Sequence, residues 1–469
     1  MSVYTHKMSL STVINSPVFT WLRSKAPGFS LNGNKVSVIS EPSVFYETLL
    51  NQCLSSKQRI TLVSLYLGTG ALEEKLVSSI HQNLKESNGA VRVKILLDYT
   101  RGSRGSHNSR TMLLPLLDKY QKSCQVCLYH TPTLREPLRS LLPQRYNELA
   151  GLQHMKLYLF DDSIIISGAN LSKDYFTNRQ DRYVLIEDCK PLADFYDALV
   201  SRVCDFSLHL DKANQVQLHE RWDIHPYKGD KERFTAAARQ HMGELGLHQD
   251  SEVTRHLLES AQDGSTVHLS SGYFNLTQDY IDCLLHRSSA NYHILMAHPT
   301  VRNKPLFFIQ ALGPLFSLGS SVIPLVQANG FYEAKGLAGG IPAAYTLLAT
   351  KFLGHIRRAD QESRVFVYEF QRPGWTFHSK GLWYSPPGSM LPTLTLVGSS
   401  NFGARSVSRD LETQVAILTS NPKLQQDFAN ERDQLFSRGT LFTQNIISKP
   451  ERIVPFWVHG VARLFRNYF

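Results

Sequence analysis

The sequence predicts an α/β protein made of two pseudo-symmetric halves, each with α/β/α layers and a mixed sheet, and one active site shared at their interface. Three observations support this fold class. The order strand, helix, strand occurs twice along the chain, a His-x-Lys sequence follows each time at the start of a strand pair, and a helix closes each copy. We expect two such units to pack face to face, because each must bury the apolar face of its sheet.

The individual elements follow from hydrophobic periodicity. Residues 59–66 form an apolar run typical of a strand, and the apolar residues of the helix predicted over 71–84 share one face. A strand over 91–97 completes the first unit, which we expect to cross over right-handed into a parallel pairing. The ranges predicted for the second unit and for the two closing helices are 265–274, 277–285, 292–296, 190–203 and 423–436.

The two His-x-Lys sequences are the candidate catalytic centre. His154 and Lys156 lie two positions apart on a predicted strand, so their side chains share one face, and His378 and Lys380 repeat this arrangement. An imidazole can attack phosphorus while an ammonium group holds the phosphate oxygens. One such pair is more often a strand with surface His and Lys, but two copies in equivalent positions indicate phosphoryl chemistry.

These motifs resemble the phospholipase D superfamily, whose pattern is His-x-Lys-x4-Asp followed by Gly-Ser-x-Asn. The first copy matches through Asp161, whereas Ser385 occupies the Asp position of the second copy and begins a Pro/Gly-rich insert over 385–392. A structural role for Asp161 at its strand end would explain this replacement. The resemblance implies two phospholipase D-like halves. The catalytic residues that it implies are His154, Lys156, Asp161, Asn170, His378, Lys380 and Asn401.

The expected mechanism gives each histidine a role. One attacks the phosphorus, and the other protonates the leaving group and then takes a proton from the acceptor hydroxyl. His154 is assigned as the nucleophile, because its copy of the motif is better preserved. Asp181 and Glu412 follow the two motif asparagines at comparable distances and are predicted to orient the imidazoles. The two lysines supply positive charge, so we expect neither a metal nor another cofactor.

A basic loop is the candidate phosphate-binding site. Arg101, Arg104 and Arg110 lie in a Gly/Ser-rich stretch that follows a predicted strand end, where ligand sites of α/β proteins tend to lie. Tyr66 and Tyr273, in corresponding positions of the two halves, complete the predicted substrate-binding set. A solvated basic loop without a ligand is the alternative.

The charge and the apolar segments bear on the partners. A net charge of +10 and a pI near 9.2 indicate acidic partners, such as nucleic acid, anionic lipid or phosphorylated substrates. Residues 305–332 contain no charged residue, and their prolines and glycines favour an interfacial segment or a buried insertion over one spanning helix. The basic, aromatic C-terminus predicts a helix that lies on an anionic membrane or docks on the protein.

The predicted domain organisation follows from the duplication. The first 40 residues contain no Asp or Glu, which is typical of a targeting segment, although an ordinary flexible N-terminus explains the composition equally well. The six cysteines are scattered and predict free thiols in a reducing compartment. The predicted segments are a targeting or flexible segment (1–35), the first half (36–205), a linker (206–249), the second half (250–440) and a basic amphipathic segment (441–469).

Three stretches, at residues 64–70, 167–183 and 375–383, are similar to one family within this superfamily, the mitochondrial CDP-diacylglycerol–glycerol-3-phosphate 3-phosphatidyltransferases. The resemblance implies transfer of a phosphatidyl group from CDP-diacylglycerol to glycerol 3-phosphate, with release of CMP, at the mitochondrial inner membrane. It implies an anionic membrane surface as a partner and no nucleic acid. The alternatives are a phosphatidylserine or cardiolipin synthase, a phospholipase, a nuclease, or an inactive membrane scaffold.

Overall fold

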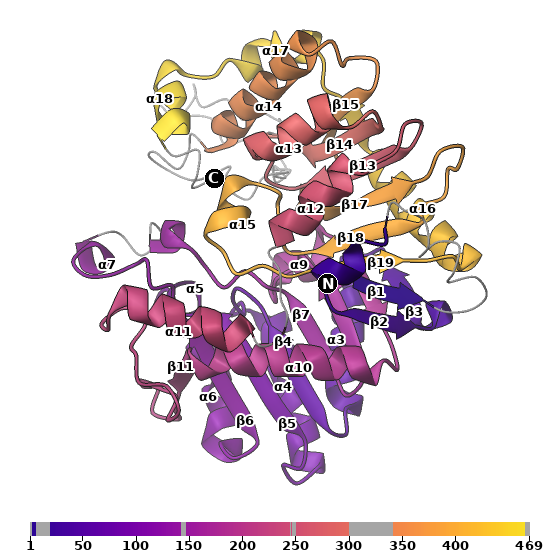
Figure 1. The fold of residues 1–469 in the computed structure, drawn as a ribbon. Coiled ribbons are helices and arrows are strands. Elements are labelled where there is room, and N and C mark those ends of the chain that lie inside the picture. Colours follow the sequence, from indigo (N-terminus) through magenta and orange to yellow (C-terminus); the bar gives the residue numbers. More distant parts are fainter. Residues whose placement is uncertain are drawn as a thin grey trace, which may run out of the picture.

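Two mixed β-sheets of nine strands each form the centre of the molecule, one in each half (Figure 1). The computed structural model describes residues 2–5, 19–141, 147–243, 245, 250–299 and 341–464. The uncharged segment predicted over 305–332 lies outside these residues. No helix in the described part of the chain is long and apolar enough to cross a membrane.

The elements of the first half and of the connection that follows it are β3 Val36–Ile39, α3 Pro42–Ser55, β4 Arg59–Val63, α4 Ala71–Glu86, β5 Arg92–Asp98, α5 Tyr99–Gly102, α6 Ser109–Tyr120, β6 Cys124–Tyr129, α7 Leu138–Leu141, β7 Leu157–Phe160, β8 Ser163–Ser167, α9 Lys173–Thr177, β9 Arg179–Gln180, β10 Tyr183–Ile186, α10 Lys190–Asp205, β11 Leu208–Leu210, β12 Val216–Leu218 and α11 Lys231–Gly243.

The elements of the second half, with the N-terminal segment that joins it, are β1 Ser2–Thr5, α2 Leu22–Lys25, β2 Gly28–Leu31, α12 Asp250–Glu259, β13 Thr266–Ser271, α13 Gln278–Asp282, β14 Asn291–Ala297, α14 Ile341–Arg358, β15 Val365–Phe370, β16 Thr376–Phe377, β17 Lys380–Ser385, β18 Leu394–Gly398, α15 Ala404–Ser408, β19 Gln414–Leu418, α16 Pro422–Phe436, β20 Gly439–Leu441, α17 Gln444–Ile447 and α18 Phe456–Leu464.

The strand orders confirm the predicted duplication. The first sheet has the order β12-β11-β6-β5-β4-β7-β8-β10-β3 and the second β2-β1-β19-β18-β17-β13-β14-β15-β20. In each sheet three parallel strands (β4, β5, β6; β13, β14, β15) continue into three antiparallel ones (β7, β8, β10; β17, β18, β19). The closing helices α10 and α16 occupy equivalent places in the two copies.

One hydrophobic cluster joins the halves. Alternating strand residues separate the two faces of each sheet. Val63 and Leu157 of the first sheet, Trp383 and Val397 of the second, and side chains of α10 and α16 belong to the same buried cluster. The outer faces have clusters of their own, under α3, α4 and α6 in the first half and under α12, α13 and α14 in the second. Each half is therefore a three-layer unit, and the inner layers meet.

The structure corrects the strand assignment at both catalytic motifs. The predicted strand over the first motif begins only at Leu157, after Lys156, and His378 precedes β17. The physical reason is that the backbone at each histidine bonds across the interface. The His154 N–H donates to the Leu411 carbonyl (2.8 Å), and the His378 N–H donates to the Gln180 carbonyl (2.8 Å). Each histidine is thus fixed by a backbone contact to the other half.

Two predicted segment boundaries also differ from the structure, and the C-terminal helix has the docked position that was one of its two predicted alternatives. Residues predicted as part of a flexible N-terminus are packed, because Phe19 and Leu22 are buried in the outer core of the second half and β2 joins its sheet through β1. In the predicted linker, β11 and β12 extend the first sheet. In the C-terminal segment, α18 docks through Val458 and Ala462 against α14.

Candidate active site

The two histidines are held by carboxylates of the opposite halves. Nδ1 of His154 lies 2.9 Å from both carboxylate oxygens of Glu412, which precedes β19 of the second half. Nδ1 of His378 lies 2.7 Å from Oδ2 of Asp181, which precedes β10 of the first half. A carboxylate accepts a hydrogen bond, so both imidazoles carry their proton on Nδ1 and present an unprotonated Nε2. The structure thus brings four predicted residues together as two crossed pairs.

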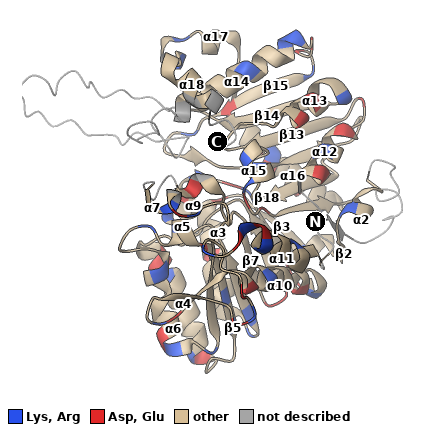
Figure 2. Cartoon of the chain, turned by 60° about the vertical axis from the view of Figure 1, so that its left-hand side comes forward, with Lys and Arg blue, Asp and Glu red and all other residues tan. Residues whose placement is uncertain are grey.

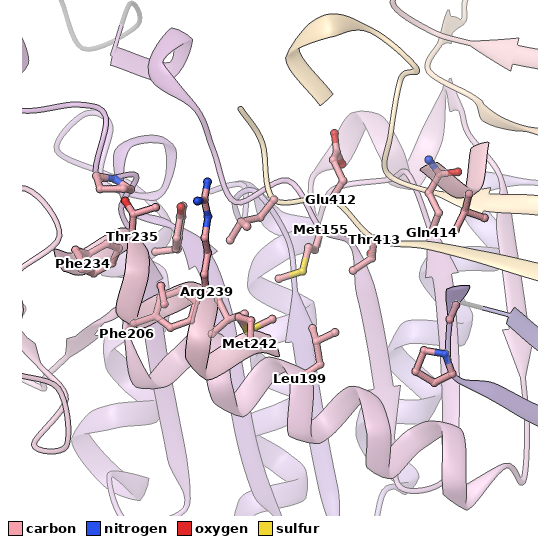
Figure 3. A pocket seen from close by; sticks show the side chains of 18 of the residues that line it. Met155, Leu199, Phe206, Phe234, Thr235, Arg239, Met242, Glu412, Thr413 and Gln414 are labelled. Atoms are coloured by element: carbon pink, nitrogen blue, oxygen red, sulfur yellow. The ribbon is translucent and has the colours of Figure 1, made fainter. Parts of the chain in front are cut away.

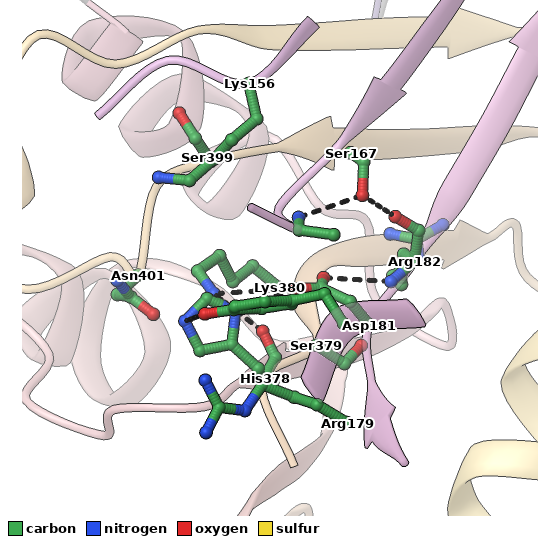
Figure 4. A network of polar contacts seen from close by, with 12 residues as sticks. Lys156, Ser167, Arg179, Asp181, Arg182, His378, Ser379, Lys380, Ser399 and Asn401 are labelled. Atoms are coloured by element: carbon green, nitrogen blue, oxygen red, sulfur yellow. Dashed lines mark hydrogen bonds and ion pairs between the residues drawn. The ribbon is translucent and has the colours of Figure 1, made fainter. Parts of the chain in front are cut away.

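The motif lysines are buried beside the histidines. Nζ of Lys156 donates to the His154 carbonyl and Nζ of Lys380 to the His378 carbonyl, each over 2.6 Å. Nζ of Lys380 also lies 2.7 Å from Nδ1 and 3.2 Å from Nε2 of His378, and 4.0 Å from Oδ2 of Asp181 (Figure 4). Burial lowers the pKa of Lys380 to about 8 and moves the pKa of Lys156 well below its ordinary value. A bound phosphate would favour the charged form of both lysines, because it places negative charge beside them.

Burial and the neighbouring lysines also lower the pKa of both histidines well below the ordinary value. Desolvation disfavours the imidazolium form, and Lys156 and Lys380 repel it. Burial has the opposite effect on the carboxylates, raising the pKa of Asp181 to about 6 and that of Glu412 above its ordinary value. At neutral pH the site therefore contains two neutral imidazoles, as required of a nucleophile and a base.

The motif asparagines lie at the same centre. Nδ2 of Asn170 donates to the hydroxyl of Tyr175 (3.1 Å), and Ser64 Oγ donates to Asn170 Oδ1 over 3.4 Å. Oδ1 of Asn401 is buried and has no hydrogen-bond partner among the described residues. Figure 4 shows the Asn401 amide facing the imidazole of His378. The Asn401 amide therefore lies beside the catalytic histidine of its own half.

Asp161 does not belong to this centre, although the family motif places it among the catalytic residues. Its carboxylate accepts hydrogen bonds from the backbone N–H groups of Lys57, Gln58 and Arg59 at 2.8, 2.7 and 3.0 Å. It therefore fixes the chain before β4 at the far end of β7, since β7 begins beside Lys156 and ends before Asp161. This contact is remote from the reacting groups and explains why Ser385 can take the equivalent position.

The predicted phosphate loop is partly neutralised by protein contacts. Arg104 lies 2.8 Å from Glu148, and Arg110 donates to the Asn214 carbonyl of the β11–β12 turn. Arg101 stacks on the ring of Tyr66, with its Cζ atom 3.9 Å from the ring centroid. Arg101 also lies 4.0 Å from Glu148. The loop is thus not an open cradle of three guanidinium groups, because all three arginines have protein contacts.

Sequence reasoning missed Tyr175, Arg179 and Arg405. Tyr175 and Tyr273 pack edge-on against His378, with ring centroids 5.0 and 5.4 Å away. The Arg179 guanidinium lies over the Tyr175 ring, and Arg405 pairs with Asp410 at 2.8 Å. A signal was present for the two arginines, since each lies between a motif asparagine and the orienting carboxylate of its half.

One group of potential metal ligands adjoins the site. Donor atoms of His154, Asp410 and Glu412 lie within 4.8 Å of one another. Each already has a protein partner: Glu412 binds His154 and Ser399, and Asp410 accepts from Arg405 and from the Leu152 N–H. The arrangement of these donors serves the histidines, and the chemistry described below needs no ion there.

A cavity of about 360 Å³ lies behind Glu412 (Figure 3). Its lining is mostly apolar and comes from α10, α11 and the chain before β19, with Met155, Leu199 and Met242 among its residues. Neither histidine lines it. The cavity therefore adjoins the candidate site at Glu412, which also binds His154, but does not include the reacting groups.

No protein-family model matches the sequence. Among curated proteins, the chain is 41% identical to the mitochondrial CDP-diacylglycerol–glycerol-3-phosphate 3-phosphatidyltransferases of Gallus gallus and Homo sapiens, over 96% of this chain and 86% of theirs. A probable enzyme of the same name from Dictyostelium discoideum is 34% identical, over 96% of this chain and 80% of its own. The chain belongs to this family of 3-phosphatidyltransferases.

The fold agrees with that membership. Among solved structures, the phosphatidylserine synthase of Haemophilus influenzae matches with a TM-score of 0.68 over 93% of each chain, at 17% sequence identity. At this identity the match shows the fold alone. The predicted fold class is therefore confirmed by this match. The family inferred from residues 64–70, 167–183 and 375–383 is confirmed by the relatives above, and the chain is an enzyme.

Proposed function

We propose that the protein transfers the phosphatidyl group of CDP-diacylglycerol to the hydroxyl of sn-glycerol 3-phosphate, releasing CMP, through a phosphohistidine on His154. The observation that carries this proposal is the crossed pairing of two neutral histidines with Glu412 and Asp181 beside two buried lysines. Family membership supports the choice of substrates, because the names of the relatives contain both CDP-diacylglycerol and glycerol 3-phosphate.

In the first step, Nε2 of His154 attacks the phosphorus on the diacylglycerol side, and the bond from that phosphorus to the CMP oxygen breaks. Glu412 accepts a hydrogen bond from the Nδ1–H group of the imidazolium that forms on His154. A phosphate monoester has a second pKa near 6, so CMP can leave as an anion at neutral pH. Because His378 is neutral, this favours departure without the protonation of CMP that the sequence suggested.

In the second step, Nε2 of His378 takes the proton of the acceptor hydroxyl and then releases it to solvent, which returns His378 to its neutral form. The acceptor oxygen attacks the phosphorus, the phosphorus–nitrogen bond breaks and His154 returns to its neutral form. The motif lysines and Asn401 stabilise the charge on the phosphorus oxygens. Arg101 and Arg179, near Tyr66 and Tyr175, are the guanidinium groups that we propose for the acceptor's own phosphate.

A comparison of acceptors tests this function. The purified protein is incubated with CDP-diacylglycerol and either glycerol 3-phosphate, serine or phosphatidylglycerol, and CMP release is measured. We expect strong stimulation by glycerol 3-phosphate alone. His154→Ala and His378→Ala should each lower the rate by about 10³-fold or more, whereas the exposed His286→Ala should not. Equal stimulation by serine, or near-normal rates in either folded site variant, would contradict the proposal.

We further propose that the protein acts in the mitochondrion on the inner membrane, bound to one anionic lipid surface. The substrate's acyl chains remain in a bilayer, so the head group must be reached there. Ile453 and Phe456, near α18, are 74% and 93% exposed, and Leu141 at the end of α7 is 74% exposed. In Figures 1 and 2, α7 and α18 lie on the same side of the molecule, on either side of α15.

A further inference from the structure

Tyr175 of α9 contacts the reactive nitrogen of one histidine only. Its hydroxyl lies 3.2 Å from Nε2 of His378, and its side chain is 2% exposed. The same hydroxyl oxygen accepts a hydrogen bond from Nδ2 of Asn170. Tyr175 therefore links the motif asparagine of the first half to the motif histidine of the second.

The direction of each hydrogen bond in this chain follows from its ends. Asp181 is a carboxylate and accepts, so Nδ1 of His378 carries the ring proton and Nε2 has a free lone pair. The Asn170 amide nitrogen can only donate, so the Tyr175 oxygen is its acceptor. The one hydroxyl proton of Tyr175 is then directed at Nε2 of His378, which Nζ of Lys380 also approaches to 3.2 Å. Burial raises the pKa of Tyr175 well above its ordinary value, which keeps this proton in place.

The second half has no equivalent tyrosine. Tyr175 lies five positions after Asn170, and the residue five positions after Asn401 is Ser406. The Ser406 hydroxyl accepts from the Asn401 backbone N–H. No hydroxyl group of the described residues is hydrogen-bonded to Nε2 of His154. The duplicated site is therefore asymmetric at the two nitrogens that react.

We propose that Tyr175 is a positioning residue for the acceptor half-reaction: it holds Nε2 of His378 unprotonated and aimed at the acceptor hydroxyl. This inference rests on the proposed two-step transfer and assigns its steps to different groups. His154, whose Nε2 has no phenol against it, reacts first with phosphorus. His378 is the base of the second step. The acceptor hydroxyl displaces the Tyr175 hydroxyl from Nε2 of His378 before it gives up its proton.

The hydrogen bond from Tyr175 has a defined effect on protonation. A hydroxyl that donates to Nε2 can do so only while that nitrogen is unprotonated, so it stabilises neutral His378. Losing the hydroxyl should therefore raise the pH at which the His378–Asp181 pair takes up a proton. The titratable and charged groups that face His378 are Asp181, Lys380, Arg179, Lys156, His154, Tyr175 and Tyr273. All but Tyr175 are unchanged when that residue becomes phenylalanine.

Tyr175→Phe separates the two half-reactions. Exchange of labelled CMP into CDP-diacylglycerol without an acceptor reports the first step, and transfer to glycerol 3-phosphate reports both. We expect exchange to stay within about two-fold of the wild type and transfer at pH 7 to fall about ten-fold. In the pH–rate profile of transfer, the acidic limb, where the rate falls as the pH is lowered, should move to higher pH by about half to one unit.

Tyr183→Phe is the matched control, because Tyr183 is equally buried and its hydroxyl has no hydrogen-bond partner among the described residues. It should leave exchange, transfer and the acidic limb unchanged. Equal losses of exchange and transfer in Tyr175→Phe, or an unmoved acidic limb, would overturn the role of Tyr175 alone. If the wild-type protein transfers to glycerol 3-phosphate but shows no CMP exchange, the phosphohistidine route and this inference both fail.

Discussion

At the scale of single residues, the protonation of the crossed carboxylates sets the pH range in which the site is active. Burial raises the pKa of Asp181 from 3.8 to about 6, so this carboxyl becomes protonated as the pH falls through 6. His378 then loses its acceptor at Nδ1. Because the folded pKa is above the unfolded one, protonation between pH 6 and 4 stabilises the fold relative to the unfolded chain. Activity should therefore fall below pH 6 without a matching loss of stability from this residue.

Asp181→Asn tests this assignment. The amide cannot fix the Nδ1–H tautomer as a carboxylate does, so we expect transfer to fall between about 10² and 10⁴-fold. What remains should lack the acidic limb near pH 6. The measurement is a pH–rate profile beside a thermal unfolding curve, with the exposed Asp118→Asn as control. A folded Asp181→Asn variant that keeps the wild-type limb would show that another group sets it.

At the scale of elements, glycine at position 381 allows β17 to start beside the catalytic residues. Gly381 has a φ of 127°, and a Cβ atom there would lie 2.2 Å from both the Leu396 carbonyl oxygen and Nη1 of Arg182. Gly381→Ala should lower the free energy of unfolding by at least about 2 kcal/mol, through strain and the displacement of these neighbours. A urea unfolding curve measures the change.

Gly243→Ala, at the end of α11, is the control for that substitution, since a Cβ atom there has no neighbour within 4 Å. It should be neutral or stabilise the fold by up to about 1 kcal/mol. If the two variants unfold alike, the chain around Gly381 relaxes without cost. In that case the close packing at β17 does not determine how the catalytic lysine is held.

The same scale shows what the sequence could predict. Periodicity identified β4, α4, β5, α10 and α16 within a few residues, because each buries one face or one apolar run. The duplicated spacing also brought both histidines and both carboxylates to one interface. Periodicity did not show that the backbone at each histidine leaves its own sheet, since that conformation is stabilised by bonds from the other half.

The same limit applied to Tyr175. It looks like an ordinary apolar residue of a short helix, and only the folded interface places its hydroxyl against a histidine 203 positions away. Asp161 shows a different limit, because the sequence left both a catalytic and a structural role open for it. The motif includes it, but a motif does not say whether a carboxylate contacts the substrate or caps a loop, as Asp161 does.

At the scale of the whole molecule, buried charges join the halves into one body. Arg182, before β10, is fully buried and lies 2.8 Å from Glu431 of α16, and the Trp383 indole N–H donates to the same carboxylate. Removing one partner of such a pair leaves an uncompensated buried charge. The two halves are thus constrained at the interface that carries the site, which keeps each histidine on the carboxylate of the other half.

One side of this rigid body carries the exposed apolar groups that the membrane proposal requires. Phe456 and Trp457 of α18 are 93% and 46% exposed, while Val458 of the same helix is buried. Docking and membrane contact are therefore compatible, because α18 has one face for each. Burying an exposed Phe or Trp side chain in the lipid interface is worth about 1.5–3 kcal/mol.

Phe456→Asp with Trp457→Asp should accordingly weaken flotation with cardiolipin-containing vesicles by at least about ten-fold, while activity on detergent-dispersed substrate falls less. Met390→Asp is the matched control. Met390 is 78% exposed, but lies in the turn between β17 and β18, at the end of these strands remote from Lys380. It should float normally. Normal flotation of the α18 variant, or equal loss in the Met390 variant, would show that another surface meets the bilayer.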